Sequence, residues 1–312
     1  MLSTGASGLF SEREEQCHQE RRRRAKPLND QEMHLQVISN CNSSIPVRIA
    51  SSCGVVEADD PWWQVTIGLF PDNLSPCRGY KMERIPAMPR AAREMLIDRY
   101  CPEDLQAFVR TNRDDQDCLV RLYTGRRRLP SASQSRFQRF SLRNYPLHVD
   151  QMEELGLDTH AIARTLADAL THCYWIAGVD ANDVEFVLAP QKTHSEHCEN
   201  SPEVPRFRSD ALGGEFVIWM LDYDCCREMS QDEAGVDQAV KAFYRNDPYY
   251  PRPYAHGHAE EDRSLWQTFR SRFLESSRHI LKGRTALATI LIEKIEEEGR
   301  RRCERGGLEG AD

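Results

Sequence analysis

The sequence has neither an export signal nor an apolar run long enough to cross a membrane. Residues 1–10 contain no apolar core of the length that export requires. The longest apolar runs fall far short of the ~20 residues of a membrane-spanning helix. We therefore expect an intracellular protein, cytoplasmic or nuclear, without a membrane partner.

The 11 cysteines include no Cys-x-x-Cys pair. Structural zinc sites combine paired ligands at defined separations, so this absence disfavours zinc. An alternative zinc site remains in the compact group His194, His197 and Cys198, taken together with Cys225 and Cys226. Without an export signal, the cysteines are expected to be reduced thiols, most of them buried as small apolar side chains.

The chain also lacks an excess of positive charge. It has 41 Lys and Arg against 49 Asp and Glu, a formal net charge of −8. Nucleic acid is therefore not expected to bind through the overall field of the molecule. Two basic runs, Arg21–Arg24 and Arg126–Arg128, either meet a phosphate or an acidic partner or, as is more common, are solvated surface charge.

The 312 residues are 40% hydrophobic and 29% charged, which fits a soluble protein with one large domain or two lobes. Residues 1–25 are polar and predicted to be disordered. Residues 26–88 predict a small sheet with one helix, and Trp62–Phe70 is their strongest predicted strand. Helical patterns dominate residues 89–298, and residues 299–312 are predicted to be a charged tail.

Two acidic segments are the most informative part of the chain. In residues 178–188 clustered carboxylates precede a strand-forming apolar run, and in residues 217–224 they follow one. An amphipathic helix predicted for residues 159–175 leads into the first segment. A polar surface insertion, residues 190–214, separates the two. We expect the carboxylates to line one crevice; they are Asp180, Asp183, Glu185, Asp222 and Asp224.

Clustered carboxylates at strand ends favour a divalent cation, because hard cations take oxygen ligands. The alternative is that these side chains only cap strands and helices or pair with arginine. The sequence alone leaves both interpretations open.

Several short phrases stand in a fixed order between residues 29 and 280. They are Asn29–Asp30 with Met33–His34, Met82–Pro86, Ser141–Tyr145, Asp180–Leu188, Trp219–Cys225, Asp232–Gly235 and Tyr244–Tyr249. Together they resemble a fungal domain family whose members often carry the label "zinc finger protein". The resemblance implies no activity, because that family brings no established biochemical function.

The order of helix, acidic loop, strand, return strand and acidic end also resembles the catalytic core of protein kinases and aminoglycoside phosphotransferases. This resemblance implies an α+β, two-lobed kinase-like fold, with a small sheet-containing lobe (26–88) and a mainly helical lobe (89–298). It implies Mg²⁺ and ATP as cofactors. Asp180 matches the loop carboxylate that receives the substrate hydroxyl proton, and Asp222 matches the Asp that holds magnesium.

The same resemblance assigns the remaining site residues. Lys26, or a residue near it, takes the nucleotide-facing position, and Glu32 is the helix carboxylate that pairs with it. Glu83, within the phrase Met82–Pro86, leads into the hinge that meets an adenine. Glu185 and Asp224 join Asp222 as metal ligands.

The chain departs from the kinase pattern at several positions. No Gly-rich loop precedes Lys26, so the backbone N–H groups that cradle phosphates are missing. Gly178 stands where the fold has a His, Glu185 stands where it has an Asn, and Tyr223–Asp224 replaces Phe-Gly. These departures favour a degenerate kinase-like domain that acts by binding a nucleotide or a protein partner.

Two alternatives remain. The first is an active phosphotransferase that uses Asp180 and Asp222 with magnesium. The second is a zinc-binding or nuclear regulatory interaction protein, whose acidic segments only build the fold.

Overall fold

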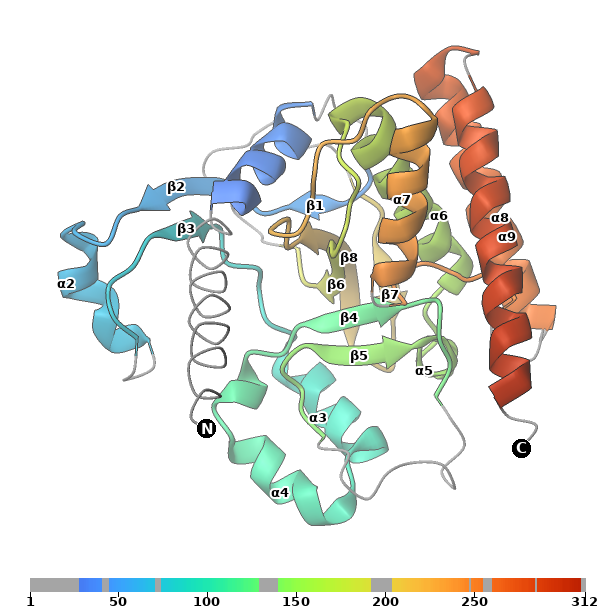
Figure 1. Ribbon diagram of the computed structural model, residues 1–312. Coiled ribbons are helices and arrows are strands. Elements are labelled where there is room, and N and C mark those ends of the chain that lie inside the picture. Colours follow the sequence, from blue (N-terminus) through green and yellow to red (C-terminus); the bar gives the residue numbers. More distant parts are fainter. Residues whose placement is uncertain are drawn as a thin grey trace, which may run out of the picture.

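A mixed sheet forms the centre of the molecule in the computed structural model (Figure 1). The structure describes residues 28–40, 45–70, 74–128, 140–191, 204–246, 248–254, 260–283 and 285–309. The strand order is β1-β8-β6-β4-β5, and β7 pairs with β8 beside this path. The strands are β1 (Arg48–Ile49), β4 (Val120–Tyr123), β5 (Tyr145–His148), β6 (Glu185–Ala189), β7 (Phe207–Ser209) and β8 (Gly214–Leu221). The predicted class, helices combined with a sheet, is confirmed.

Helices surround this sheet (Figure 1). The described ones are residues 28–39, α3 (Arg90–Tyr100), α4 (Glu103–Thr111), η2 (Asp114–Gln116), α5 (Val149–Glu154), α6 (Thr159–Thr171) with its π-helical continuation η4 (His172–Ala177), α7 (Glu233–Arg245), α8 (Glu260–Leu281) and α9 (Ala286–Glu309). The predicted central helix is confirmed as α6. The Asp158 side chain caps its first turn by accepting a hydrogen bond from the Ala161 N–H at 2.8 Å.

The two faces of the sheet bury different amounts of apolar surface. Phe186 and Leu188 of β6 point into the main core, which also holds the apolar side of α6. Val187 and Ala189 point to the opposite face, where a smaller cluster includes Trp219. Because side chains alternate along a strand, a one-residue change in register would exchange the two sets.

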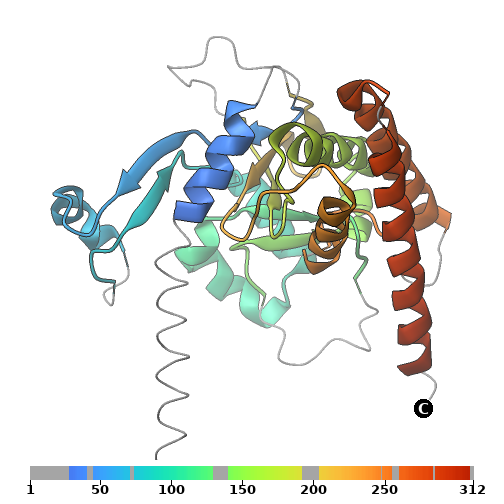
Figure 2. The same ribbon diagram turned by 45° about the horizontal axis from the view of Figure 1, so that its top comes forward.

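A two-stranded ribbon projects from the body of the molecule in both views (Figures 1 and 2). We call it the arm: β2 (Ser52–Val56) pairs with β3 (Gly79–Met82), and α2 (Trp62–Thr66) and η1 (Ile67–Leu69) form its tip. The predicted strand over Trp62–Phe70 is therefore wrong. The Asp60 carboxylate accepts the Trp62 N–H at 2.8 Å and starts a helical turn. That turn brings the rings of Trp63 and Phe70 to 5.4 Å, so aromatic packing overrides strand propensity.

The two-lobed kinase-like arrangement is not confirmed. Arg48 and Ile49 of β1 belong to the predicted first lobe, yet they pair in parallel with Trp219 and Met220 of β8. The early chain thus contributes to the central sheet, and the arm is the part that stands apart.

Two other segments differ from their prediction. Part of the predicted surface insertion, residues 190–214, lies outside the described residues, but Phe207 and Ser209 within it are buried in β7. The predicted tail continues α9 as far as Glu309, and Gly299 packs there against Tyr244. Lys26 and residues 1–25 lie outside the described residues. No helix within the described ranges is both long and apolar enough to span a bilayer.

Candidate acidic cation site

The pairing of β6 with β8 brings the two acidic segments together. The strands are antiparallel, and Glu185 at the start of β6 lies opposite Leu221 at the end of β8. Asp222 follows Leu221 directly, so residues about forty positions apart along the chain share one end of the hairpin. We call Asp183, Glu185, Asp222 and Asp224 the acidic cluster.

Among the described residues, the donor atoms that lie close enough together to bind one cation belong to Asp183, Asp224 and Cys225. One ligand atom from each of these three side chains lies within 4.8 Å of the other two. Asp183 is exposed, and Asp224 and Cys225 are half-buried, so the set is open to solvent on one side. Two carboxylates suit a hard cation, and the thiol adds a softer donor.

Burial and like charge raise the pKa of two members of the acidic cluster. Burial raises the pKa of Asp222 to about 6, and the charges of Asp224, Asp30 and Asp183 add to the effect. Burial also raises the pKa of Glu185 to about 7; Arg121 opposes this shift, and Asp222 and Asp183 reinforce it. Burial is the main cause of both shifts, and at Asp222 the neighbouring negative charges add a repulsion that a cation would relieve.

The loops that carry the cluster have an unusual backbone conformation. The φ angles of Ala181, Asp183 and Asp222 are 51°, 66° and 66°, in the left-handed region. Asn246, which is buried, holds the first loop: its side-chain oxygen accepts the Asp183 N–H, and its amide donates to the Ala181 carbonyl at 3.1 Å. Asn182 joins the two loops by donating to the Cys225 carbonyl at 3.0 Å.

Residues 28–39, a helix from the start of the described chain, hold the second loop. The Asn29 amide donates to the Asp224 carbonyl at 2.8 Å, and the Asp30 carboxylate accepts the Tyr223 N–H at 3.1 Å. The His34 ring stacks on Tyr223 at 4.9 Å. Burial lowers the pKa of His34 to about 4, so this ring is neutral at neutral pH.

Asp180, the predicted catalytic carboxylate, faces the interior of the loop structure. It is 3% exposed. Its Oδ1 accepts the N–H groups of Asn182 and Arg227 at 3.1 and 3.0 Å, and its Oδ2 accepts the Gln238 amide at 2.8 Å. In this arrangement the carboxylate organises both loops and presents little surface to a substrate.

We predict that Asp180→Asn destabilises the protein by about 2 kcal/mol. The asparagine amide must turn its NH2 group toward at least one of the present donors, which breaks a hydrogen bond in a buried site. Urea unfolding of the variant measures this loss. A variant that unfolds like the wild type would contradict the structural role of Asp180.

Of the other predicted site residues, Glu185 belongs to the acidic cluster, whereas Glu83 and Glu32 lie elsewhere. Glu185 forms an ion pair with Arg121 of β4. Glu83 accepts hydrogen bonds from the Ser51 N–H and hydroxyl at 3.1 and 3.0 Å, near the base of the arm. Glu32 is exposed on helix 28–39. The structure thus groups Asp222, Asp224 and Glu185 and leaves Glu32 and Glu83 elsewhere.

Sequence reasoning did not assign several residues of this site. Asp183 belongs to the carboxylates for which the sequence favours a divalent cation, but the kinase resemblance gives it no ligand role, and Asp30, Asn182 and Asn246 have no predicted role. The loop Ala181–Asp183 contained a usable signal, because Asn and Asp tolerate left-handed backbone better than most residues. The contact with Asn246 spans more than sixty positions and has no local signal.

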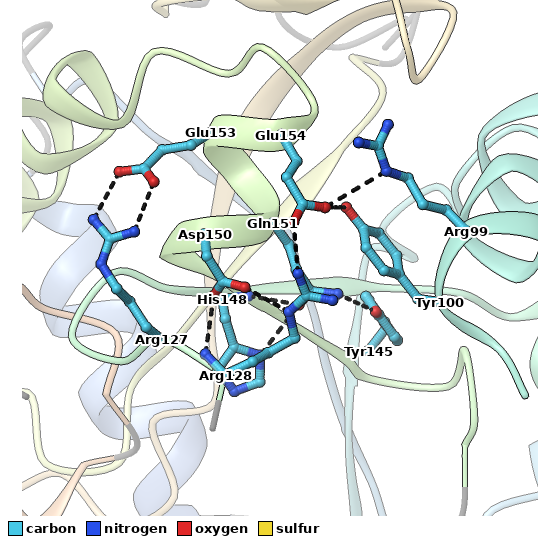
Figure 3. A network of polar contacts seen from close by, with 10 residues as sticks. All are labelled: Arg99, Tyr100, Arg127, Arg128, Tyr145, His148, Asp150, Gln151, Glu153 and Glu154. Atoms are coloured by element: carbon cyan, nitrogen blue, oxygen red, sulfur yellow. Dashed lines mark hydrogen bonds and ion pairs between the residues drawn. The ribbon is translucent and has the colours of Figure 1, made fainter. Parts of the chain in front are cut away.

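Within the basic run Arg126–Arg128, Arg127 and Arg128 are engaged in ion pairs (Figure 3). Arg127 makes two bonds to Glu153, at 2.6 and 2.8 Å, and Arg128 reaches Glu154 at 2.8 Å. This network ties the segment after β4 to α5. Arg127 and Arg128 are thus neither simply solvated nor left open for a phosphate, because carboxylates of the same chain pair with them.

Comparison with known proteins gives one finding. A family model described as "Zinc finger protein" matches residues 218–285, which include the end of β8, the Asp222–Asp224 turn, α7 and α8. No curated protein and no solved structure matches the chain. The expected family label is therefore confirmed over that segment.

The label does not identify a zinc site. Within the described part of the matched segment, Cys225 is the cysteine that joins a group of potential metal ligands. Cys226 beside it is buried, and its thiol contacts the Asn182 carbonyl. His194, His197 and Cys198 lie outside the described residues.

Proposed function

We propose that the acidic cluster binds one divalent cation and that the chain is a degenerate kinase-like domain that uses this cation to bind a nucleotide. Asp183 and Asp224 are the direct ligands, and Asp222 is the neighbouring carboxylate whose charge the cation neutralises. The observation that carries the cation site is the approach of the Asp183, Asp224 and Cys225 ligand atoms to within 4.8 Å, and nucleotide binding is the proposed use of that cation.

The electrostatics of the cluster support a cation. Unit charges about 4 Å apart repel by about 4 kcal/mol in the effective dielectric of a protein surface. The raised pKa of Asp222, about 6, reflects burial together with this repulsion. A divalent ion removes the repulsion in the way that a proton does, so protons and cations compete for the cluster.

The same charges set the order of binding. A triphosphate brings further negative charge to the cluster and is repelled unless a metal ion lies between them. Magnesium is commonly held by one or two carboxylates together with substrate phosphates. Nucleotide binding is therefore expected to need the cation, whereas the cation is expected to bind alone.

Binding is favoured over phosphoryl transfer by the position of Asp180. A general base must reach the proton that it takes. The Asp180 carboxylate is 3% exposed and accepts three hydrogen bonds from the protein.

Thermal-shift measurements with MgCl₂ or MnCl₂, with ATP, and with both test this proposal. A ligand that binds the native state at about 100 times its Kd adds about 2.7 kcal/mol of stability. We expect a shift with the cation, a larger shift with cation and ATP, and none with ATP alone. The double variant Asp183→Asn/Asp224→Asn should lose the response and keep its fold, because Asn tolerates the left-handed backbone at position 183.

Zinc is the comparison ion. Under the proposal, Cys225→Ser leaves the Mg²⁺ and Mn²⁺ responses unchanged, since carboxylates are the ligands of hard cations. A response confined to Zn²⁺ and lost in Cys225→Ser would replace the magnesium site with a zinc site.

A further inference from the structure

The tip of the arm presents apolar side chains to solvent. Val65 and Leu69 are 85% and 78% exposed, and Phe70 beside them is 37% exposed. The arm carries them away from the body of the molecule in both views (Figures 1 and 2). Single exposed apolar residues are ordinary, but a group on a projecting element marks an interaction surface.

An internal cluster of aromatic rings holds this surface in a fixed shape. Trp63 is buried, and its ring lies 4.9 Å from Trp62 and 5.4 Å from Phe70. The Trp63 indole N–H donates to the Glu57 carbonyl at 3.0 Å, and the Lys81 ammonium lies 5.3 Å from the Trp62 ring. The tip is therefore organised before any partner arrives, which lowers the entropy lost on binding.

Among the described residues of the arm, the acidic side chains Glu57, Asp59 and Asp60 outnumber the basic side chains Arg78 and Lys81, so the edge of the tip has a small negative charge. Asp59 is exposed and precedes α2, and Asp60 uses one carboxylate oxygen to cap Trp62. Glu57 is paired with Arg78 at 2.8 Å, so that pair adds little net charge. An apolar surface with an acidic edge complements an apolar groove with a basic rim.

We infer that the arm tip docks a partner protein, by inserting Val65 and Leu69 into an apolar groove bordered by Lys or Arg. A second copy of this chain is disfavoured, because it brings the same acidic edge and a net charge of −8. An anionic lipid surface is disfavoured by the same charges.

Selection from a displayed library of random peptides tests this inference. The matched proteins are the wild type, the tip variant Val65→Ser/Leu69→Ser, the edge variant Asp59→Lys, and the control Phe108→Ser. Phe108 lies on α4, away from the tip, and is 64% exposed. Phe108→Ser therefore also replaces an exposed apolar side chain with serine. Unchanged circular dichroism and Tm show that each variant is folded.

We expect the selected peptides to combine apolar residues with Lys or Arg and to bind wild type and Phe108→Ser equally. The tip variant should lose about tenfold or more in affinity, because contacts at an interface centre dominate binding. Asp59→Lys and high salt should also weaken binding.

Other results overturn the inference. These are no enriched peptide, peptides without basic residues, or peptides that bind the tip variant unchanged. Dimerisation in sedimentation that the tip variant abolishes would assign the surface to a second copy. Flotation with anionic phospholipid vesicles that the tip variant abolishes would assign it to lipid. Protection of Val65 and Leu69 from hydroxyl-radical footprinting in the purified monomer would show that the chain covers the tip itself.

Discussion

The metal-free protein is expected to lose stability as the pH rises from about 5 to about 8, by on the order of 2 kcal/mol. Glu185 has an ordinary pKa of 4.5 and a pKa of about 7 in the folded protein, and Asp222 moves from 3.8 to about 6. A raised pKa means that the folded state binds protons more strongly than the unfolded state. The contribution is therefore complete below the ordinary values and is lost as the pH rises through the folded values.

Saturating MgCl₂ or MnCl₂ is expected to remove the part of this loss that Asp222 contributes, because the cation neutralises that carboxylate in place of a proton. Urea unfolding at the two pH values, with and without the cation, measures the effect; in a thermal melt it corresponds to roughly 3 °C in Tm. Asp222→Asn is the control, since Asn tolerates the φ of 66° and cannot ionise. It should reduce the pH dependence and leave the part that Glu185 contributes. Two results would contradict the account of the cluster. One is a free energy of unfolding that rises between about pH 5 and about pH 8, and the other is one that the cation leaves unchanged.

Replacing Arg252 with methionine is expected to destabilise the protein by about 3 kcal/mol. The guanidinium donates to the Phe243 carbonyl at 2.6 Å and to the Asn246 carbonyl at 3.2 Å, at the C-terminal end of α7. It lies 4.4 Å from the Phe243 ring and 5.0 Å from the Tyr244 ring. Burial lowers the pKa of Arg252 to about 10, so it remains charged at neutral pH.

Arg302→Met is the matched control for this prediction. The Arg302 guanidinium lies 4.5 Å from the ring of Tyr244, which Arg252 also contacts, but its side chain is 51% exposed. A contact of this kind contributes about 0.5–1 kcal/mol at an exposed site. The urea concentrations at the unfolding midpoints of both variants measure the two losses of stability. Equal losses would contradict the capping role that we assign to Arg252.

Arg252→Met should also weaken the cation response. Asn246, whose carbonyl Arg252 holds, fixes the loop of Asp183 through its own side chain. A cation response equal to that of the wild type would show that the loop keeps its shape without this support.

Local patterns predicted the parts of the fold that depend on local interactions. The apolar period of residues 159–175 predicted α6. Lys282 and Gly283, which both have positive φ, lie at the break between α8 and α9. These features follow from side-chain spacing and backbone preference within a few residues.

Long-range contacts decided the features that the sequence did not predict. Trp62–Phe70 has strand propensity, but its rings pack on each other in a helical turn. The sequence placed Arg48 and Ile49 in a separate small lobe. In the structure these residues pair with β8 and extend the central sheet. Neither outcome is visible in a local window.

The candidate site shows the same division. Two acidic strand ends in one chain correctly suggested that their carboxylates would meet. The sequence did not reveal that Asp180 faces inward or that Glu185 meets Arg121, because both outcomes depend on neighbouring elements. The predicted metal ligands were Asp222, Glu185 and Asp224. Because of those contacts, we propose Asp183 and Asp224 as the ligands instead.

Anomalous diffraction from crystals soaked in MnCl₂ tests the central claim most directly, because it locates the cation without depending on activity. The account predicts a manganese peak within ~2.5 Å of carboxylate oxygens of both Asp183 and Asp224, and no such peak in crystals of Asp183→Asn/Asp224→Asn. Wild-type crystals that bind manganese only at other residues, or that bind none, would contradict it.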